Sequence, residues 1–311
     1  MNVYRLLPNE CEYLITDESD FLSQTNSRFP WVQEKIDTDT HIPKKHYYAI
    51  CPACGCPVEL INLIESKRKQ NSPSAYAKHV RSDVSGLAKY DQNRYDLCPL
   101  ASGTYSVANK PRRQGDVSVN KIYIDFLKEN LDKIIYMYEK SLGILFSDRS
   151  IERMLSEFLA FENEKILAIN KFNFPWLFLL SINFNFSEFK IKKDGRLFKQ
   201  IEKLKSKGIK LFPTKSDNLF VVRSENGKYL DLAYVTVDYE LYDGSKHERR
   251  ERAKISVSQI NESASALTVP EKILTFYLNA EPDYFNKILN LKNWERSPRQ
   301  KKIMSIASSV L

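Results

Sequence analysis

The sequence predicts an α+β protein with a loop-rich N-terminal part, followed by helices and antiparallel strands. Three observations support this fold class. Four of the five cysteines fall between positions 51 and 98, in a stretch with little apolar periodicity. From about position 119, apolar residues recur every three or four positions, as they do on one face of an α-helix. Between about 219 and 257 the period becomes two, which is typical of strands.

Short apolar segments predict the strands of the N-terminal part. Residues 3–7 and 12–15 are two such segments, and Pro8-Asn9 separates them. Residues 47–50 and 58–64 are two more, and they flank a turn that holds three cysteines. We expect the second pair to form an antiparallel hairpin with this turn at its tip.

Cysteine and histidine spacing predicts a metal site at that hairpin. Cys51 and Cys54 are two residues apart, so one tight turn aims both thiolates at the same point, and Gly55 allows the positive φ that such a turn needs. His79 and Cys98 complete the tetrahedral N/S ligand set that Zn²⁺ prefers. The run CPACG resembles the knuckle of zinc-ribbon and treble-clef modules. The resemblance covers this run alone, so it implies a zinc-stabilised scaffold and carries no function with it.

Other interpretations of these residues stay open. Cys56 could replace His79 or Cys98 as a ligand, and His46 is a further substitute for His79. The thiols could also be reduced core residues. Disulfides fit poorly, because five is an odd count and no secretory signal precedes the first charged residues, so we expect a cytoplasmic protein. The histidines lie in no H-x-E or H-E-x-x-H frame, so we expect a structural zinc and no catalysis by it.

Composition predicts the domain boundaries. We expect an N-terminal region at 1–105, with the zinc module at about 46–105. Residues 106–118, which include Lys110-Pro111-Arg112-Arg113, are the predicted linker. Residues 119–311 are the predicted helical and antiparallel-β domain.

Periodicity then predicts the elements of that domain. We expect helices at about 119–138, at 150–169 with Ser150 as the cap, and at 195–207 with a basic outer face. The densely aromatic stretch 174–189 is the predicted buried core. Further helices are expected at three places near the C-terminus, at about 270–278, 283–291 and 298–309.

The alternating stretch predicts a three-stranded antiparallel meander. Its strands are expected at 219–222, 229–242 and 252–257. Asn226-Gly227 and Asp243-Gly244 supply the turn residues that tight hairpins require.

The charge of the chain favours a polyanionic partner. The formal net charge is +8 and the pI is near 9.0, which favours nucleic acid first. Basic groups occur in five places, namely 67–69, 112–113, 190–210, 246–252 and 296–302. No apolar run reaches the ~18–20 residues that span a membrane, so we expect no membrane partner. The abundance of Lys, Asn, Ile, Phe and Tyr suggests an AT-rich coding sequence, as in a bacterium or phage.

The predicted meander also carries acidic residues that suggest a different activity. Asp231, Asp238 and Glu240 lie on its long strand, and Lys254 lies on the next one. A carboxylate pair beside a lysine is what a Mg²⁺-dependent nuclease uses to hold metal and water. The spacing before Lys254 misses the usual frame by one residue, so solvent-facing ion pairs are the competing interpretation.

We therefore expect a zinc-stabilised, non-catalytic binding protein that acts on nucleic acid or on a nucleic-acid-processing partner, in a bacterial or phage system. A Mg²⁺-dependent nuclease is one alternative. A protein-interaction subunit or inhibitor without nucleic-acid contact is the other.

Overall fold

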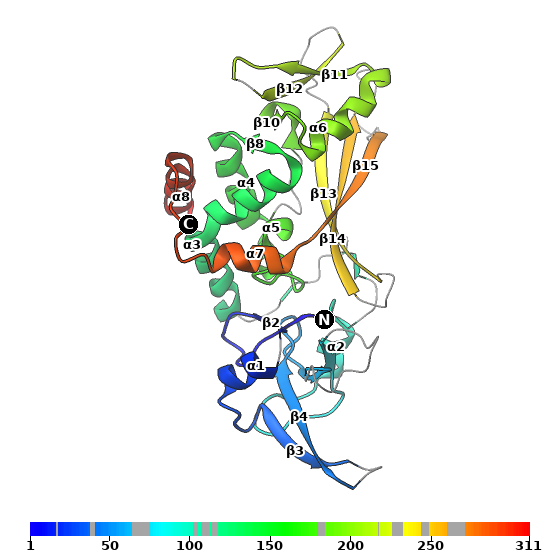
Figure 1. Ribbon diagram of the computed structural model, residues 1–311, viewed down its shortest axis with the longest axis vertical. Helices are drawn as coiled ribbons and strands as arrows, with labels where there is room; N and C mark the ends of the chain where they lie inside the picture. The colour runs from blue at the N-terminus through cyan, green and yellow to red at the C-terminus, as the bar shows by residue number, and fades with distance from the viewer. Residues whose placement is uncertain are drawn as a thin grey trace. The chain divides into compact units, whose positions relative to one another are not determined.

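The computed structural model describes most of the chain, namely residues 1–16, 18–37, 41–63, 75–101, 105–106, 112–113, 117–178, 184–216, 218–225, 233–243, 249–259 and 271–311. Within these ranges the protein mixes helices with antiparallel strands (Figure 1). The α+β class predicted from the sequence is therefore confirmed at this level.

The chain forms two compact units. The N-terminal unit comprises residues 1–123, 165–171 and 241–250. The C-terminal unit comprises residues 124–164, 172–240 and 251–311. The boundaries predicted at 105 and 118 stay a prediction.

The N-terminal unit consists mainly of short strands. Its elements before the long helix are β1 (Val3–Tyr4), β2 (Tyr13–Leu14), α1 (Glu18–Thr25), β3 (Val32–Ile36), β4 (Pro43–Ile50), β5 (Pro57–Ile61), β6 (Tyr76–His79), α2 (Gln92–Asp96) and β7 (Tyr105–Ser106). Strands β1 and β2 pair antiparallel, and β3, β4, β5 and β6 form a four-stranded sheet in that order. The hairpin predicted from the apolar segments is present, because Ile50 of β4 pairs with Pro57 of β5.

A small apolar core holds this unit together. The last four residues of β4 are buried, and Val58 and Leu60 of β5 are buried beside them. Phe21 of α1 packs edge-on against both Tyr4 and Tyr47. The sheet is thus covered on part of one face by α1, and its cysteine-bearing end is the β4–β5 turn.

The C-terminal unit begins within a long helix and has two groups of strands. Its elements are α3 (Val117–Leu142), β8 (Ile144–Phe146), α4 (Asp148–Ala160), 3₁₀ helix η3 (Asn163–Lys165), α5 (Phe174–Leu177), β9 (Phe184–Asn185), η4 (Phe186–Glu188), β10 (Phe189–Lys192), α6 (Arg196–Ile201), η5 (Glu202–Lys207), β11 (Ile209–Pro213), β12 (Leu219–Ser224), β13 (Ala233–Asp243), β14 (Arg249–Gln259), β15 (Glu271–Asn279), α7 (Pro282–Leu289) and α8 (Pro298–Val310).

Aromatic side chains fill the core between α3, α4 and α5, as the sequence predicts. Phe158 of α4 contacts Phe174 and Phe178, and Tyr138 of α3 contacts Trp176 edge-on. Each of these side chains is almost completely buried. At the end of α3, Gly143 has a φ of +73° and lies against Gly195, so a Cβ at either glycine would collide with the other's backbone.

A separate lobe follows, built from residues 189–225 together with β8. Its sheet has the order β11-β12-β10-β8, all antiparallel. Helix α6 packs on one face of this sheet, where the Phe198 ring meets the Phe220 ring. The lobe therefore has two layers, one of strands and one of helix.

Three predictions of local structure need correction. Strand β12 pairs with β10 and β11, so it belongs to another sheet than β13 and β14, and the predicted three-stranded meander is not confirmed. Residues 271–279 form strand β15, which pairs with β14, although a helix was predicted there. Phe276 and Leu278 are buried and the residues between and beside them are exposed, and this period of two is that of a strand. The cap of α4 is Ser147, not Ser150.

No helix among the described residues combines the length and the apolar character that crossing a membrane requires.

Candidate metal centre

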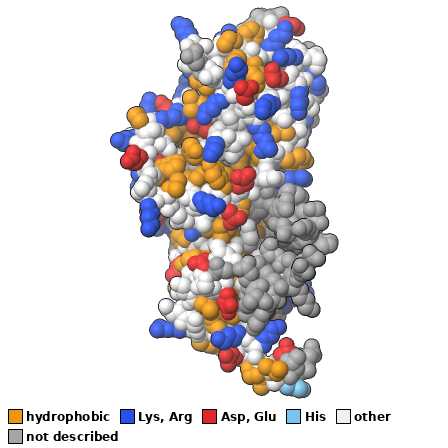
Figure 2. All heavy atoms as spheres, in the orientation of Figure 1, with side chains coloured by type: hydrophobic (Ala, Val, Ile, Leu, Met, Phe, Trp, Pro, Cys, Tyr) orange, Lys and Arg blue, Asp and Glu red, His pale blue; other side chains and the backbone are white. Residues whose placement is uncertain are grey.

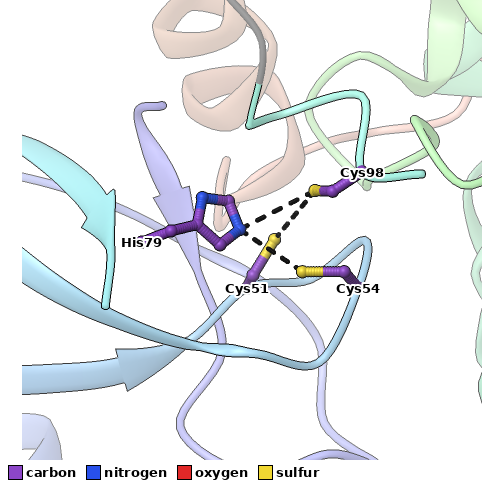
Figure 3. Close-up of side chains that lie close together, drawn as sticks. All are labelled: Cys51, Cys54, His79 and Cys98. Atoms are coloured by element: carbon purple, nitrogen blue, oxygen red, sulfur yellow. Dashed lines mark hydrogen bonds between the residues drawn. The ribbon is translucent and has the colours of Figure 1, made fainter. Parts of the chain in front are cut away.

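Four side chains that are distant in the sequence converge in the N-terminal unit. Cys51 directly follows β4, Cys54 lies in the β4–β5 turn, His79 ends β6, and Cys98 follows α2. Their side chains point toward one another (Figure 3). One possible ligand atom from each, three Sγ atoms and a histidine nitrogen, lies within 4.8 Å of all the others. These are the four ligands that the sequence predicts.

The distances within the group are short and even. Cys51 Sγ lies 3.7 Å from Cys98 Sγ, and His79 Nε2 lies 3.3 Å from Cys54 Sγ and 3.7 Å from Cys98 Sγ. The three cysteines are buried and His79 is half-buried. Such a group, enclosed by protein and made only of sulfur and nitrogen, could hold a metal ion.

Backbone hydrogen bonds shape the turn that presents the first two thiols. The Gly55 N–H donates to the Cys51 carbonyl, and the Cys51 N–H donates to the Cys56 carbonyl, each at 2.9 Å. Gly55 has a φ of +74°, a value that a residue with a Cβ rarely adopts. On the other side of the turn, Arg5 and Ile50 exchange two backbone hydrogen bonds of 2.9 Å. Backbone hydrogen bonds thus fix the turn at both ends.

Sheet pairing and a short helix bring in the other two side chains. His79 lies opposite Val58 in the β5–β6 ladder, which places its ring at the knuckle. The ring of Tyr95, on α2, packs edge-on against His79 with 5.2 Å between centroids. The Cys98 N–H donates to the Tyr95 carbonyl at 3.0 Å. Helix α2 therefore orients both the imidazole and the third thiol of the group, that of Cys98.

The two substitute ligands considered from the sequence lie elsewhere. Cys56 is fully buried, and its Sγ contacts the Asp91 carbonyl at 3.5 Å, where it joins the turn to the start of α2. His46 Nδ1 lies 2.6 Å from a Glu59 carboxylate oxygen. Neither belongs to the group of four, because alternation along β4 and β5 and the direction of the turn point them away from it.

The proximity of the thiols perturbs their ionisation. Burial would raise the pKa of Cys51, but hydrogen bonds from Cys54, Cys98 and His79 outweigh it and hold the pKa well below its ordinary range. Hydrogen bonds to Cys51 raise the pKa values of Cys54 and Cys98. The three thiols therefore compete for a single negative charge, which Cys51 is best placed to carry. A divalent cation would let all of them ionise, because each thiolate would then face a positive charge.

Comparison with protein-family models, with curated proteins and with solved structures found no match for this chain. Its function must be argued from its own residues.

The described residues do not test the nuclease alternative. Asp231 lies outside the described residues, and so do the side chains of Asp238 and Glu240, whose backbone belongs to β13. Lys254 is half-buried on β14, opposite Tyr277 of β15. This alternative stays a prediction.

The structure also reveals a buried ionic group that the sequence pattern did not indicate. The Arg5 guanidinium donates to the carboxylate of Glu12, and the Tyr123 hydroxyl donates to the same carboxylate. The Arg113 guanidinium donates to the Tyr123 oxygen at 3.3 Å and lies over its ring. All four side chains are buried. Residues 5, 12, 113 and 123 have no common spacing, so only the tertiary fold could show this group.

Proposed function

We propose that this protein is a zinc-stabilised, non-catalytic nucleic-acid-binding protein. The observation that carries the proposal is the group Cys51, Cys54, His79 and Cys98. All four positions of a tetrahedron would be occupied by protein ligands, so no position remains for a water or a substrate. A metal held in this way stabilises a fold and does not perform hydrolysis.

Zinc is the metal that the distances favour. A tetrahedral zinc with thiolates about 2.3 Å away has sulfur atoms about 3.8 Å from one another. The Cys51–Cys98 sulfur distance is 3.7 Å. Three thiolates and an imidazole are also the soft and intermediate donors that select zinc over the oxygen-seeking Mg²⁺ and Ca²⁺.

The segment between His79 and Cys98 is the part of the fold that a bound metal would hold in place. It contains one short helix, α2, without a buried residue, and few apolar side chains. A segment of this kind cannot stay folded through burial alone, and two of the four ligands lie at its ends. We infer that zinc attaches it to the β4–β5 turn.

The metal proposal is tested by elemental analysis with a matched pair of variants. Protein purified without added metal should contain about one zinc per chain. Cys54→Ser should lose it and should lose amide protection in β5, β6 and α2, because structural zinc supplies about 10–16 kcal/mol in finger peptides. Cys56→Ser removes a thiol from the same turn and should keep the zinc. A folded wild-type protein without metal would refute the proposal, and metal loss in Cys56→Ser alone would overturn the ligand assignment.

Nucleic acid is proposed as the partner because of the charge of the chain. Its formal net charge is +8, and Lys and Arg outnumber Asp and Glu by 47 to 39. Binding of a labelled oligonucleotide should weaken steeply with salt, because bound lysines and arginines displace counterions from phosphates. If the wild-type protein binds no DNA or RNA at low salt, this part of the proposal fails.

One observation favours a protein partner as the second candidate. Ile36 and Ile42, at the turn end of the β3–β4 hairpin, expose 69% and 64% of their surface. Large apolar side chains exposed together often mark a protein contact. Co-purification of a partner with wild-type protein but not with a double variant, Ile36→Ser with Ile42→Ser, would support this function.

A further inference from the structure

The positive charge of this protein is concentrated in one lobe. Residues 189–225 contain eleven Lys and Arg and four Asp and Glu, a formal charge of +7 out of +8 for the whole chain. On the face that Figure 2 shows, Lys and Arg side chains gather over the part of the molecule that α6, β11 and β12 occupy in Figure 1. The other 274 residues are almost neutral by comparison, because they carry a formal charge of +1.

Strand alternation divides these basic residues between the two sides of the lobe. Ile191, Phe220 and Val222 share the inner face of the sheet, where the Phe198 ring of α6 meets Phe220. The residues between them along each strand must point to the opposite face. The described side chains of this opposite face are exposed or half-exposed. We call it the basic sheet face; it is defined by Lys190, Lys192, Lys210, Phe212, Val221 and Arg223.

The strand register places one pair of like charges directly opposite each other on this face, because Lys210 of β11 lies opposite Arg223 of β12. On β10, the next strand, Lys192 lies opposite Leu219 of β12 and Lys190 lies opposite Leu145 of β8. Like charges directly opposite one another destabilise a sheet. On this face the exposed Glu225 is bonded to Lys210, and Lys192 lies close enough to the carboxylate of Glu139 to interact with it electrostatically. An exposed ion pair is worth little, so a phosphate can replace it at low cost.

An aromatic side chain lies on the same face, next to this pair. Phe212 is two residues beyond Lys210 on β11, so both point to the same side, and it lies opposite Val221. It is half-exposed. An accessible ring beside phosphate-binding cations is the arrangement on which an unpaired base stacks, while a duplex keeps its bases out of reach.

We propose that the basic sheet face binds single-stranded nucleic acid, with its lysines and arginine on the phosphates and Phe212 against a base. This rests on the proposed nucleic-acid function and deepens it by naming the surface and the strandedness of the ligand.

The outer side of α6 and η5 is basic as well, but it lacks the other features. Lys203 bonds to Gln200 and Lys205 bonds to Glu202 on the same helical segment. The aromatic residue of α6, Phe198, is turned toward the sheet. Lys199, Lys203 and Lys205 are therefore a matched control, because replacing them removes the same charge from the other side of the same lobe.

The test compares two triple variants of the full-length protein. One carries Lys190→Gln, Lys192→Gln and Lys210→Gln, and the other carries Lys199→Gln, Lys203→Gln and Lys205→Gln. Fluorescence anisotropy is measured with labelled oligo(dT), oligo(U) and a mixed-sequence duplex, each about 20 units long, which exceeds the site of a single binding domain. Thermal unfolding of each variant confirms that the lobe remains folded.

The sheet variant should bind single strands about 100-fold more weakly at 0.1 M salt, and the slope of log K against log salt should fall by about 2, since three phosphate contacts are lost. The helix variant should stay within about threefold of wild type, because general charge acts weakly at that salt. Phe212→Leu should weaken binding about tenfold without changing the salt slope. The oligo(dT) and oligo(U) measurements decide between DNA and RNA.

Three results would overturn the inference while leaving the proposed function intact. They are equal losses in the two triple variants, tighter binding of the duplex than of single strands to the wild type, and an unchanged affinity in Phe212→Leu. A wild-type protein that binds none of the probes would instead refute the proposed function.

Discussion

Replacing the buried carboxylate of Glu12 should destabilise the N-terminal unit more than replacing an exposed carboxylate of the same unit. Glu12 exposes none of its surface. Its carboxylate accepts hydrogen bonds from the Arg5 Nε at 3.0 Å, from the Tyr123 hydroxyl, and from the Lys171 N–H at 3.3 Å. Glu12→Gln removes the charge but keeps the shape. Arg5, which is 3% exposed, would then be a buried cation without its counter-charge.

The expected cost follows from that burial. Removing one partner of a buried ion pair costs about 3–5 kcal/mol, and a whole domain is stable by about 5–15 kcal/mol. Glu12→Gln should therefore lower the Tm of this unit by about 10 °C or more. Arg5 exchanges backbone hydrogen bonds with Ile50, the residue before Cys51, so we expect metal affinity to fall as well.

The pH dependence gives a second readout with a definite sign. Burial would raise the pKa of Glu12, but the Arg5 guanidinium and the hydrogen bonds outweigh it and hold the pKa below its ordinary 4.5. A carboxyl with a lowered pKa stabilises the folded state above pH 4.5, and this stability is lost as the pH falls through the lowered value. The wild type should lose stability in that acid range, and Glu12→Gln should lose less there.

Denaturant unfolding at several pH values, followed by amide exchange in β1 and β2, measures both effects. Glu34→Gln, at an exposed position of β3, is the control and should change stability by less than about 0.5 kcal/mol. If Glu12→Gln matches Glu34→Gln at neutral pH, the buried pair does not hold this unit together and the reasoning is wrong.

Two further predictions concern the C-terminal unit. Gly143→Ala should cost about 3 kcal/mol or more, because it adds left-handed strain and a Cβ only 2.5 Å from the Cα of the glycine that faces it. Gly208→Ala has a similar φ of +75° but meets nothing within 4 Å, so chemical denaturation should show a loss of only about 1 kcal/mol. Arg299→Ala should release α8 in hydrogen exchange, since Arg299 donates to the buried carboxylate of Glu139, whose pKa burial already raises. Lys302→Ala, which removes an exposed ion pair from the same helix, should leave that exchange unchanged.

The sequence predicted local features well. The Cys51-x-x-Cys54 spacing, with a glycine after it, determines a tight turn by its own backbone chemistry. Helices α7 and α8 and the β4–β5 hairpin followed from periodicity, because each is stabilised by contacts between near neighbours in the chain. His79 and Cys98 were predicted as the other two members of the set, with Cys56 and His46 left open as substitutes.

Strand partners and long-range burial could not be predicted in this way. The run Leu219–Ser224 looked like the first strand of a meander, yet it pairs with β10, which lies before it in the chain. Periodicity indicates that a segment is a strand, but it does not indicate which other strand the segment pairs with. That choice depends on side chains that meet only after the chain has folded. The same holds for Glu271–Asn279, where cross-strand packing against β14 outweighed helix-like spacing.

The sequence by itself thus determined the cysteine turn, the ligand types and the total charge, which all depend on residue identity and short spacing. Only the tertiary structure decided that Cys56 lies outside the group of four, that Arg5 and Glu12 share a buried site with Tyr123, and that the lysines divide between two sides of one lobe. Each of these features depends on which distant segments pack together. That outcome depends on the total free energy of burial and strand pairing over the whole chain, not on any short segment.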